Sequence, residues 1–389
     1  MKLAALLASG ALVLAACGSP DPAAGGGSLV LVSAPLSSAP WIGSFVERGA
    51  RLAARELGDV RVEVRDNRGS PQQAVADARE AVELGAAALV TDGVGAVAVS
   101  EVSDPAALPV FVVFEGGASV VDPAARPTVF RLAPANRAMS RRLAAYLSEK
   151  ASRVALLGDD TSYGREGTEA TRAELERNGV RTVADAVLPS GARDVRAQVL
   201  AARRADAQAL VVWAGATGVA AVVEAARSTG WDVPVYSGPT AEDPLVRQQL
   251  ADHPEWVEGL VFVSFRITSE VGPEPFAAYR RAYEAEYGAD RVGVGDLVQP
   301  PDWSTYSYDA VKLVRASLAA SGGRGGQPLV DALQTTVITG ANGDERGYGP
   351  TDREGVSPDD MYFGRFGPDL RFAPVTDDIL STGLPAVEQ

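Results

Sequence analysis

The residue types that most often carry catalysis or bind metals are scarce in this chain of 389 residues, which has one cysteine, Cys17, and one histidine, His253. A metal site built on several cysteines or histidines is therefore excluded, and a histidine-dependent triad would have to use His253. That histidine stands in a turn-like Asp-His-Pro-Glu sequence without a nucleophile motif. Gly93 and Gly95 repeat only a fragment of the dinucleotide fingerprint. We expect no catalytic residue, no metal and no cofactor, and predict that the chain is not an enzyme.

Acidic residues are the other candidates for chemistry, and several of them gather in a loop near the C-terminus. Calcium takes carboxylate ligands, but their spacing fits no EF-hand, so a solvated loop is the favoured interpretation. The six are Asp344, Glu345, Asp352, Glu354, Asp359 and Asp360. The whole chain has a formal net charge of -14. This disfavours nucleic acid as a partner, because such binding depends on Lys and Arg neutralising phosphates.

The N-terminal residues predict the compartment. Lys2 precedes an apolar run, Leu3 to Leu14, which fits a secretory signal and is shorter than the roughly 20 residues of a membrane span. Small residues then lead to Cys17 in a pattern that resembles the lipobox of bacterial lipoproteins, which implies acyl chains on Cys17. An ordinary signal peptide ending near a cysteine is the alternative. We expect residues 1–16 to be a lipoprotein signal peptide, 17–28 a flexible tether, and the rest a domain held outside the cytoplasm by lipidated Cys17.

The rest of the chain alternates apolar runs of strand type with segments of helical spacing, which indicates parallel βαβ units. The same order of elements occurs twice, beginning first at Ser28 and again at Arg153. This repeat predicts two doubly wound α/β lobes with parallel sheets, related by a pseudo-twofold axis. The expected strands are 28–33, 60–64, 87–90, 108–114, 153–157, 180–187 and 209–212, and the expected helices are 45–57, 74–84, 165–178, 195–204, 275–287 and 306–320, followed by a hairpin over 361–375.

The elements also predict where a ligand would bind. In open parallel sheets, ligands bind outside the carboxyl ends of the strands, and the helix N-termini found there can hold anions such as a carboxylate. The segments that follow the expected strands therefore form the candidate site. They are 34–43, 92–96, 114–117, 158–164, 213–218 and 237–243.

Four short motifs, in their order and spacing, resemble the type I periplasmic solute-binding proteins, and in particular the branched-chain amino-acid (Leu/Ile/Val) binding proteins of ABC importers. They are Val64–Asn67, Phe130–Pro134, Asp159–Gly164 and Tyr308–Ala310. The resemblance implies a Venus-flytrap arrangement, in which two lobes joined by three crossovers close on a ligand like a hinge. It implies that the first lobe takes residues 29–134 and 267–335, and that the second takes 135–266 and 336–389.

The resemblance also implies site residues. Trp41 and Trp303 lie where the family places aromatic side chains around the ligand, and Tyr163 matches its cleft tyrosine. For each of them, a purely structural role is the alternative. Gly95 and Ala96 lie where the family typically has a serine that holds the α-carboxylate. Because neither side chain can donate a hydrogen bond, only backbone N–H groups could do so here.

An acidic group has changed lobes relative to the family. The family often has a threonine near the strand end occupied here by Glu115 and Gly116, and an acid near the position of Thr240, both of which hold the ammonium. The internal repeat supports a comparison of these two positions, because Glu115 and Thr240 occupy equivalent places in its two halves. We hypothesise that Glu115 faces the cleft and pairs with a cationic group of the ligand; a solvated loop glutamate is the alternative.

Three classes of function fit such a chain. The preferred one is the binding component of an ABC importer, which captures an amino acid or a related small amine or polar solute and delivers it to permease subunits. The alternative is a ligand-sensing lipoprotein of the same fold that signals to a membrane receptor. An extracellular enzyme is the third class, and the sequence offers no constellation of residues for it. The expected partners are a small-molecule solute, the permease, and the membrane through the lipid anchor.

Overall fold

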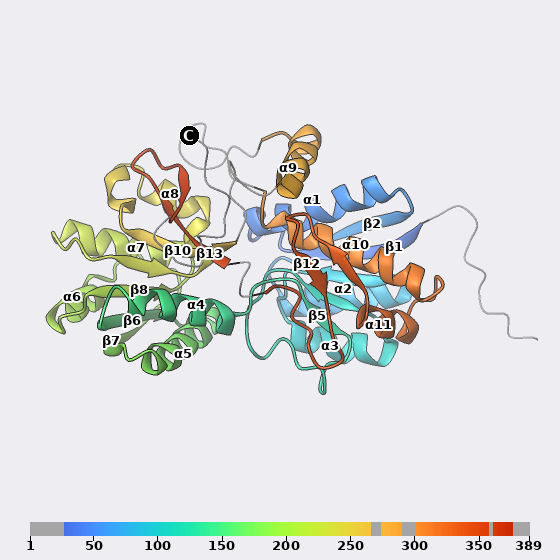
Figure 1. Cartoon of the computed structure of the whole chain (residues 1–389), viewed down its shortest axis with the longest axis horizontal. Helices are drawn as coiled ribbons and strands as arrows, with labels where there is room; N and C mark the ends of the chain where they lie inside the picture. Colours follow the sequence, from blue (N-terminus) through green and yellow to red (C-terminus); the bar gives the residue numbers. More distant parts are fainter. Residues whose placement is uncertain (1–26, 266–273, 290–300, 358–360, 376–389) are drawn as a thin grey trace, which may run out of the picture.

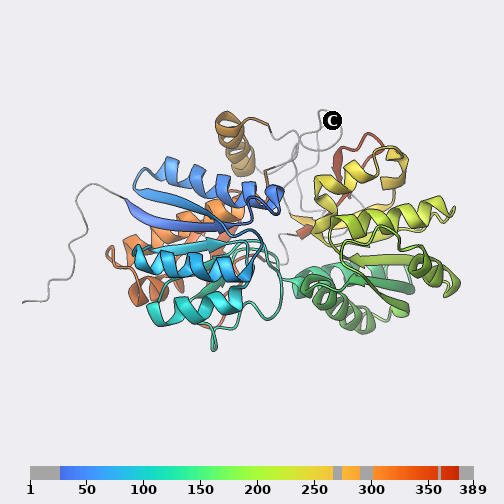
Figure 2. The ribbon, with the colours of Figure 1, turned by 180° about the vertical axis from the view of Figure 1, so that it is seen from behind.

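The computed structural model describes residues 27–265, 274–289, 301–357 and 361–375, and these form two lobes side by side (Figure 1). The expected signal peptide, Cys17 and most of the expected tether lie outside the described residues. Figure 2 shows from behind that one lobe contains the blue, cyan and orange segments and the other the green and yellow ones.

The first lobe is built on a parallel sheet with the strand order β2-β1-β3-β4-β5. Successive residues of its central strand point to opposite faces, so that Val30 and Val32 enter one apolar core and Leu31 enters the other. The sheet is therefore buried on both faces, as is usual for parallel sheets. The strands are β1 (Ser28–Ala34), β2 (Val60–Asp66), β3 (Ala88–Thr91), β4 (Val110–Val112) and β5 (Val129–Arg131).

Helices cover both faces of this sheet. One face carries α1 (Pro40–Leu57), α9 (Glu274–Tyr287), α10 (Ser304–Ala320) and α11 (Gln327–Leu333), and the other carries α2 (Pro71–Glu83) and α3 (Ala96–Ala106). The backbone of α10 comes so close to α1 that a Cβ at Gly49 would overlap the carbonyl of Ser304. Glycine is required there, and the contact fixes α10 and the aromatic residue that precedes it.

The second lobe repeats this topology. Its sheet has the order β14-β13-β10-β9-β8-β6-β7, in which β7-β6-β8-β9-β10 reproduces the order of the first sheet. The predicted pair of doubly wound lobes is confirmed. The parallel strands are β6 (Arg153–Asp159), β7 (Arg181–Leu188), β8 (Ala209–Trp213), β9 (Val235–Ser237) and β10 (Leu260–Phe265); α6 (Arg196–Arg204), α7 (Ala216–Ser228) and α8 (Pro244–Gln249) cover one face, α4 (Asn136–Ser148) and α5 (Ser162–Arg177) cover the other, and two short 3-10 helices are η1 (Pro239–Glu242) and η2 (Pro254–Val257).

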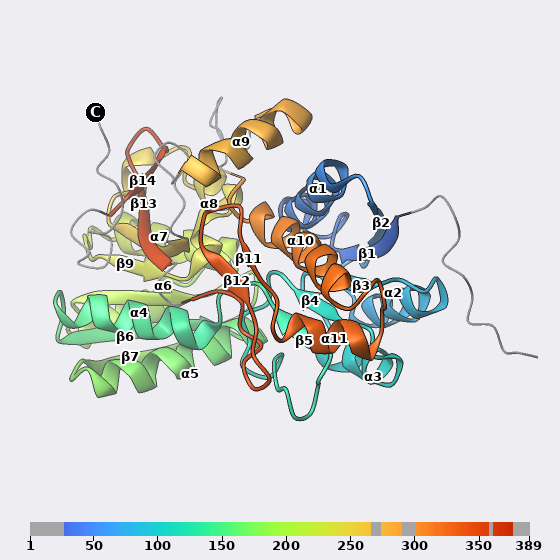
Figure 3. The same cartoon turned by 45° about the vertical axis from the view of Figure 1, so that its right-hand side comes forward.

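The last crossover lies further along the chain than residue 335, where the family resemblance implied it. Residues after 335 form an antiparallel hairpin of β11 (Val337–Thr339) and β12 (Glu345–Gly347) beside α10 (Figure 3), and Tyr348 and Val356 are buried in the first-lobe core. This polar, Gly-rich segment has strands too short for an alternating pattern to reveal them. The boundary expected at 266–267 lies outside the described residues.

The chain enters the second lobe with a hairpin that the sequence did predict. Strand β13 (Met361–Phe366) pairs antiparallel with β10 on one side and with β14 (Phe372–Pro374) on the other. These two strands extend the second sheet beyond the five that match the first lobe.

Candidate functional site

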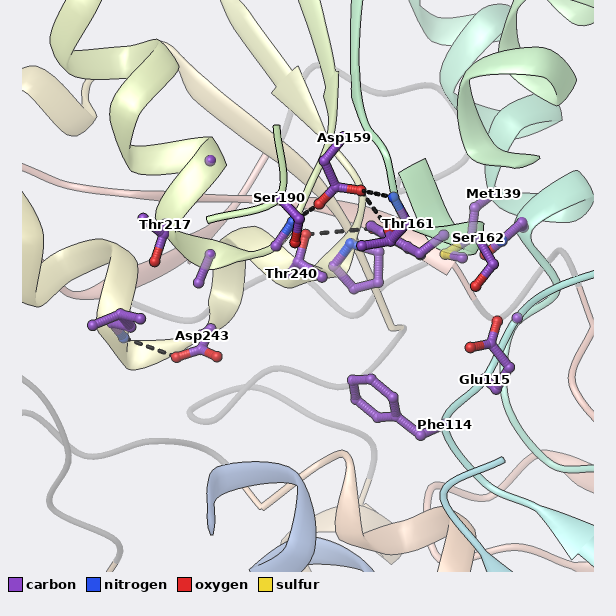
Figure 4. Close-up of a pocket in the computed structure, with 18 of the residues that line it drawn as sticks. Phe114, Glu115, Met139, Asp159, Thr161, Ser162, Ser190, Thr217, Thr240 and Asp243 are labelled. Carbon is purple, nitrogen blue, oxygen red and sulfur yellow. Dashed lines mark hydrogen bonds between the residues drawn. The ribbon is translucent and has the colours of Figure 1, made fainter. Parts of the chain in front are cut away.

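A cavity of about 520 Å³ lies between the lobes, where segments that follow strands of both sheets face each other (Figure 4). This volume lies within the range of small-molecule sites. Four of the six segments expected from the sequence line it, namely 114–117, 158–164, 213–218 and 237–243, whereas 34–43 and 92–96 contribute no lining residue. The strand-end rule therefore located most of the cavity.

Two aromatic side chains form the first-lobe wall. Trp303, just before α10, and Phe114, just after β4, both line the cavity with ring centroids 4.9 Å apart. Trp41 packs behind them, 6.2 Å from the Trp303 ring and 5.4 Å from Phe45, and it does not line the cavity. Of the two tryptophans expected at the ligand, Trp303 lines the cavity, whereas Trp41 packs against Trp303 from behind.

Glu115 lies on the same wall, as the hypothesis required. Its Oε1 accepts a hydrogen bond of 2.8 Å from the Gly117 N–H, and its backbone N–H donates to the carbonyl of Asp92 at 2.8 Å. Burial raises the pKa of the Glu115 carboxyl, against the opposing effect of the Gly117 N–H. A cation placed next to this carboxylate would lower the pKa again, so the site favours a positively charged partner.

A buried arginine holds the loop that carries Glu115. Arg131 Nη1 donates to the carbonyls of Gly117 at 2.7 Å and Glu115 at 3.3 Å. The rest of its guanidinium binds the Glu354 carboxylate in a bidentate pair, with Nε–Oε2 at 2.7 Å and Nη2–Oε1 at 2.5 Å. The arginine is only 2% exposed, so this pair fixes the loop from beneath.

The first crossover between the lobes also borders the cavity. Gly116 accepts a 2.8 Å hydrogen bond from the Asn136 N–H, and a Cβ on Gly116 would overlap the Asn136 Oδ1 and the Pro134 carbonyl. The side chain of Asn136 is 2% exposed and lines the cavity, and neither its Nδ2 nor its Oδ1 has a hydrogen-bond partner. A buried amide without partners is unusual and disfavoured, which marks Asn136 as a candidate ligand contact.

On the second-lobe side, Asp159 at the end of β6 ties two loops together. Its Oδ1 accepts from the N–H and the hydroxyl of Thr161, and its Oδ2 accepts from the Gly215 N–H at 2.9 Å. Thr161 in turn caps α5, because its hydroxyl accepts from the Gly164 N–H at 3.1 Å. Both carboxylate oxygens of Asp159 are thus engaged by the chain itself, and Asp159 positions the loops before α5 and α7.

Tyr163 and Thr240 meet at the cavity wall. The Thr240 hydroxyl donates to the Ala214 carbonyl at 2.7 Å, so the Tyr163 hydroxyl donates to it at 3.4 Å. The Tyr163 ring packs edge-on against Trp213, and a Cβ on Gly238 would overlap the Tyr163 hydroxyl. Burial raises the pKa of Tyr163 well above its usual value, so the phenol stays neutral and acts as a polar wall rather than a charge.

Asp243 also lines the cavity. From the sequence it was included only as the last residue of the segment 237–243 and was not selected as a site residue. It caps α8 through a 2.9 Å bond from the Leu245 N–H to Oδ1. Burial raises the pKa of its carboxyl, against the opposing effect of that N–H. Figure 4 shows Asp243 and Thr217 at one side of the cavity and Glu115 at the other, with the Phe114 ring lying between them.

A buried carboxyl pair joins the lobes beside the aromatic wall. Glu242 accepts from the indole Nε1–H of Trp303 at 2.9 Å through Oε2, and from the Ser264 hydroxyl through Oε1. Burial raises the pKa of Glu242 to about 7. Asp302 is also buried, with its Oδ1 lacking a hydrogen-bond partner, and burial together with the nearby Glu242 raises its pKa well above the usual range. The two carboxyls therefore favour sharing a proton over being charged together.

The remaining predicted site residues lie elsewhere. Gly95 caps α3 with φ of 67°, and a Cβ there would press on Pro71; Ala96 is buried in the core between the first sheet and α2. The loop is tied to Asn67, whose Nδ2 donates to Asp92 Oδ1 at 2.7 Å. Neither Gly95 nor Ala96 lines the cavity. Besides Trp303, the cavity instead gains six residues from outside the expected segments, which are Pro134, Asn136, Met139, Ser190, Gly191 and Leu245.

The alternatives to a binding site find no support among the described residues. His253 stacks on Trp256 with ring centroids 4.0 Å apart and contacts Glu255 at 3.1 Å, in a surface turn. No group of three His, Cys, Asp or Glu side chains within the described ranges is arranged to hold a metal ion. Asp359 and Asp360 of the acidic loop lie outside those ranges. None of the described helices is both long and apolar enough to span a bilayer.

Comparison with known proteins decides the family. Residues 29–369 match the family described as periplasmic binding protein. The chain belongs to the periplasmic binding protein family. This membership makes it a solute-binding protein rather than an enzyme and implies a location outside the cytoplasm. A comparison with curated proteins finds no match.

Solved structures with the same fold come from several bacteria. A type 1 periplasmic binding protein of Bordetella pertussis Tohama I is 19% identical, with a TM-score of 0.79, and the match covers 90% of this chain and 100% of that one. The branched-chain amino acid binding protein LivJ of Streptococcus pneumoniae, in complex with isoleucine, is 20% identical, with a TM-score of 0.75 and coverage of 90% and 100%. A solute-binding protein of Rhodopseudomonas palustris BisB5, in complex with 3,4-dihydroxybenzoic acid, is 17% identical, with a TM-score of 0.72 and coverage of 87% and 93%. At such identities the likeness establishes the fold and not the ligand.

Proposed function

We propose that this periplasmic binding protein is the solute-capturing lipoprotein of an ABC importer, and that it holds an amino acid or a related small amine in the cavity between its lobes. The observation that carries the proposal is the cavity itself, which is lined by strand-end segments of both sheets and is of small-molecule size. A ligand in this place contacts both lobes at once only when they are closed, and this selects the closed form.

Direct contacts between the lobes flank the cavity and support a closing motion. The Glu166 carboxylate on α5 accepts the Ala118 N–H of the first lobe at 2.7 Å, and Trp303 of the first lobe donates to Glu242 of the second. Both contacts use one polar group from each lobe and would separate on opening. They add to ligand contacts in stabilising the closed form that docks on a permease.

The cation preference rests on Glu115. Its carboxylate lies on the first-lobe wall with a raised pKa, and Phe114 and Trp303 beside it offer apolar surface for the body of the ligand. We expect Glu115→Gln to weaken binding of a cationic ligand at least tenfold, since the amide keeps the shape and removes the charge. Unchanged affinity would remove Glu115 from the site.

The anchor is the part of the proposal that rests on sequence alone. Cys17, after an apolar run and small residues, would carry the acyl chains, with the residues up to 28 as a tether. Expression of the full chain in a bacterium, followed by metabolic labelling with a fatty acid, tests this. Label on the wild type and none on Cys17→Ser is expected; label on both, or on neither, contradicts the anchor.

The binding function is tested on the chain from Gly18 onward. A thermal-shift screen of amino acids, amines, amides and small acids identifies ligands, because a ligand at a hundredfold excess over Kd stabilises by about 2.7 kcal/mol. Small-angle scattering with the best ligand should show contraction of the molecule. A tight ligand that leaves the scattering unchanged would contradict capture by closure.

A further inference from the structure

Two carboxylates on opposite sides of the cavity each keep one oxygen for a partner outside the chain. Glu115 uses Oε1 for the Gly117 N–H, and Asp243 uses Oδ1 for the Leu245 N–H. Within the described residues, no hydrogen bond or ion pair engages the other oxygen of either side chain. Figure 4 places them apart, with Phe114 between. Each carboxylate is fixed by its backbone bond and available to a second donor.

The third acid of the cavity behaves differently. Both oxygens of Asp159 are occupied by Thr161 and by the Gly215 N–H at the start of α7. A helix N-terminus ordinarily attracts a ligand carboxylate, but here the chain supplies its own carboxylate at that end of α7. The helix therefore offers less to an anionic ligand than its position at the cavity wall would indicate.

Asn136 provides an independent sign of a ligand at the Glu115 end. Its amide nitrogen and oxygen are buried without partners, it lines the cavity, and its backbone is bonded to Gly116 next to Glu115. An ammonium has three N–H donors, which is enough to serve both the second Glu115 oxygen and the side-chain Oδ1 of Asn136. This arrangement satisfies a group that the protein leaves unpaired.

The charged side chains that line the cavity, among the described residues, are acidic. Glu115, Asp159 and Asp243 line the cavity, and no Lys, Arg or His is found among its described lining residues. We propose that the solute carries two cationic groups, one held by Glu115 with Asn136 and the other by Asp243, with an apolar chain against Phe114 and Trp303. This inference rests on the proposed capture of a small solute between the lobes and narrows its chemistry.

Two kinds of solute share this chemistry. A linear diamine has only the two ammonium groups and the chain between them, whereas a basic amino acid adds a carboxylate. The unpaired Asn136 Nδ2 is a donor that such a carboxylate could use, and a diamine would leave it unused. The two kinds are distinguished by comparing lysine with 1,5-diaminopentane, which differ only in that carboxylate.

The test is calorimetric titration of the chain from Gly18 with 1,3-diaminopropane to 1,6-diaminohexane, lysine, n-butylamine, leucine and succinate. Glu115→Gln and Asp243→Asn remove one charge each. The amide oxygen of Gln can still accept the Gly117 N–H, and Asn caps a helix as well as Asp. Glu101→Gln, on the exposed face of α3, is the matched control. Circular dichroism melting confirms that each variant is folded.

The expected result is binding of a diamine or lysine at least tenfold tighter than n-butylamine or leucine, with an optimum in chain length. Each of the two variants should lose at least tenfold in affinity for the dication, and Glu101→Gln should lose less than twofold. Leucine or n-butylamine binding as tightly as every dication would overturn the inference while leaving solute capture intact. Failure of all dications to bind would overturn it as well, and the broader screen then decides the proposed function separately.

Discussion

The connections from the third strand to the following helix differ between the two lobes, although the strand order is the same. In the second lobe, the residues from Gly215 to Gly218 at the start of α7 line the cavity. In the first lobe, Gly95 and Ala96 at the start of α3 pack against α2 and do not line the cavity. Duplicated topology thus leaves the ligand contacts unequal, with the second lobe supplying most of the polar surface and the first lobe the aromatic wall and Glu115.

The largest expected effect on ligand affinity comes from a bulky side chain at the start of α7, where the second-lobe connection lines the cavity. Thr217 is the second residue of α7 and lines the cavity, so Thr217→Arg should place a long cationic side chain in the space of the ligand and weaken binding at least a hundredfold. Val97, the second residue of α3, is 44% exposed and outside the lining, so Val97→Arg should change affinity less than twofold. Calorimetric titration measures both. Equal losses would show that the two connections are equivalent in binding.

A pH dependence is expected at the contact between the lobes. The pKa of Glu242 is raised to about 7 from an ordinary 4.5, so between these values the folded state binds the proton more strongly than the unfolded state. The free energy of unfolding should therefore fall as pH rises from about 4.5 to 7, by roughly 2–3 kcal/mol from this group.

Urea unfolding at pH 5, 6, 7 and 8 measures this dependence. Glu242→Gln keeps an acceptor for the Trp303 indole and should reduce the dependence to the part that Asp302 contributes, whereas Glu224→Gln on the exposed surface of α7 should leave the slope unchanged. Stability that rises over this interval, with the same slope in Glu242→Gln, would show that Glu242 is not protonated in the folded protein.

The equivalent strand ends also differ in the size of one residue. Gly116 follows Glu115 where Ala241 follows Thr240, and a Cβ on Gly116 would overlap Asn136 and Pro134. We expect Gly116→Ala to lower the free energy of unfolding by about 2 kcal/mol, as overpacking does. Gly325→Ala is the control, since its Cβ would meet no atom within 4 Å. Urea midpoints decide it, and an unchanged midpoint for Gly116→Ala would mean that the crossover adapts freely.

The smallest expected effects on stability and affinity come from replacing each of the two tryptophans, Trp303 and Trp41, by phenylalanine. Trp303→Phe removes the N–H that Glu242 accepts, which should lower stability by about 1–2 kcal/mol and weaken ligand binding several-fold. Trp41→Phe removes a buried N–H without a partner but also ring contacts with Trp303 and Phe45, so it should lower stability by about 1 kcal/mol and affect ligand binding less than Trp303→Phe does. Thermal melts and titrations of both variants check this. A larger loss of affinity in Trp41→Phe would place Trp41 rather than Trp303 at the ligand.

The sequence predicted the parts of the molecule that periodicity and topology control. Apolar runs located most of the parallel strands but missed β5 and β10. The repeat correctly paired Glu115 with Thr240, each of which lies three residues beyond its strand, β4 and β9. The strand-end rule then reached four of the six segments correctly. These features depend on local pattern, which the sequence carries directly.

The rest depended on packing between distant residues. Whether α3 or α7 reaches the cavity is determined by tertiary contacts such as Pro71 against Gly95, which no local pattern contains. Asn136 begins α4 shortly after β5 ends at Arg131, and the rule did not include it because β5 was not predicted as a strand. The crossover after residue 335 was taken from the family resemblance, and this chain departs from it: β11 and β12 stay beside α10, where Arg346 pairs with the buried Asp309.

The pairing of Arg131 with Glu354 has a consequence for biogenesis. The loop that presents Glu115 is held by Arg131, and Arg131 is neutralised by a residue separated from it by 223 positions. A chain that ends before residue 354 contains every strand of the first sheet, but it cannot fix this loop. We therefore expect ligand competence to arise only when the chain is nearly complete, so that a chain still lacking residue 354 would not bind and retain solute.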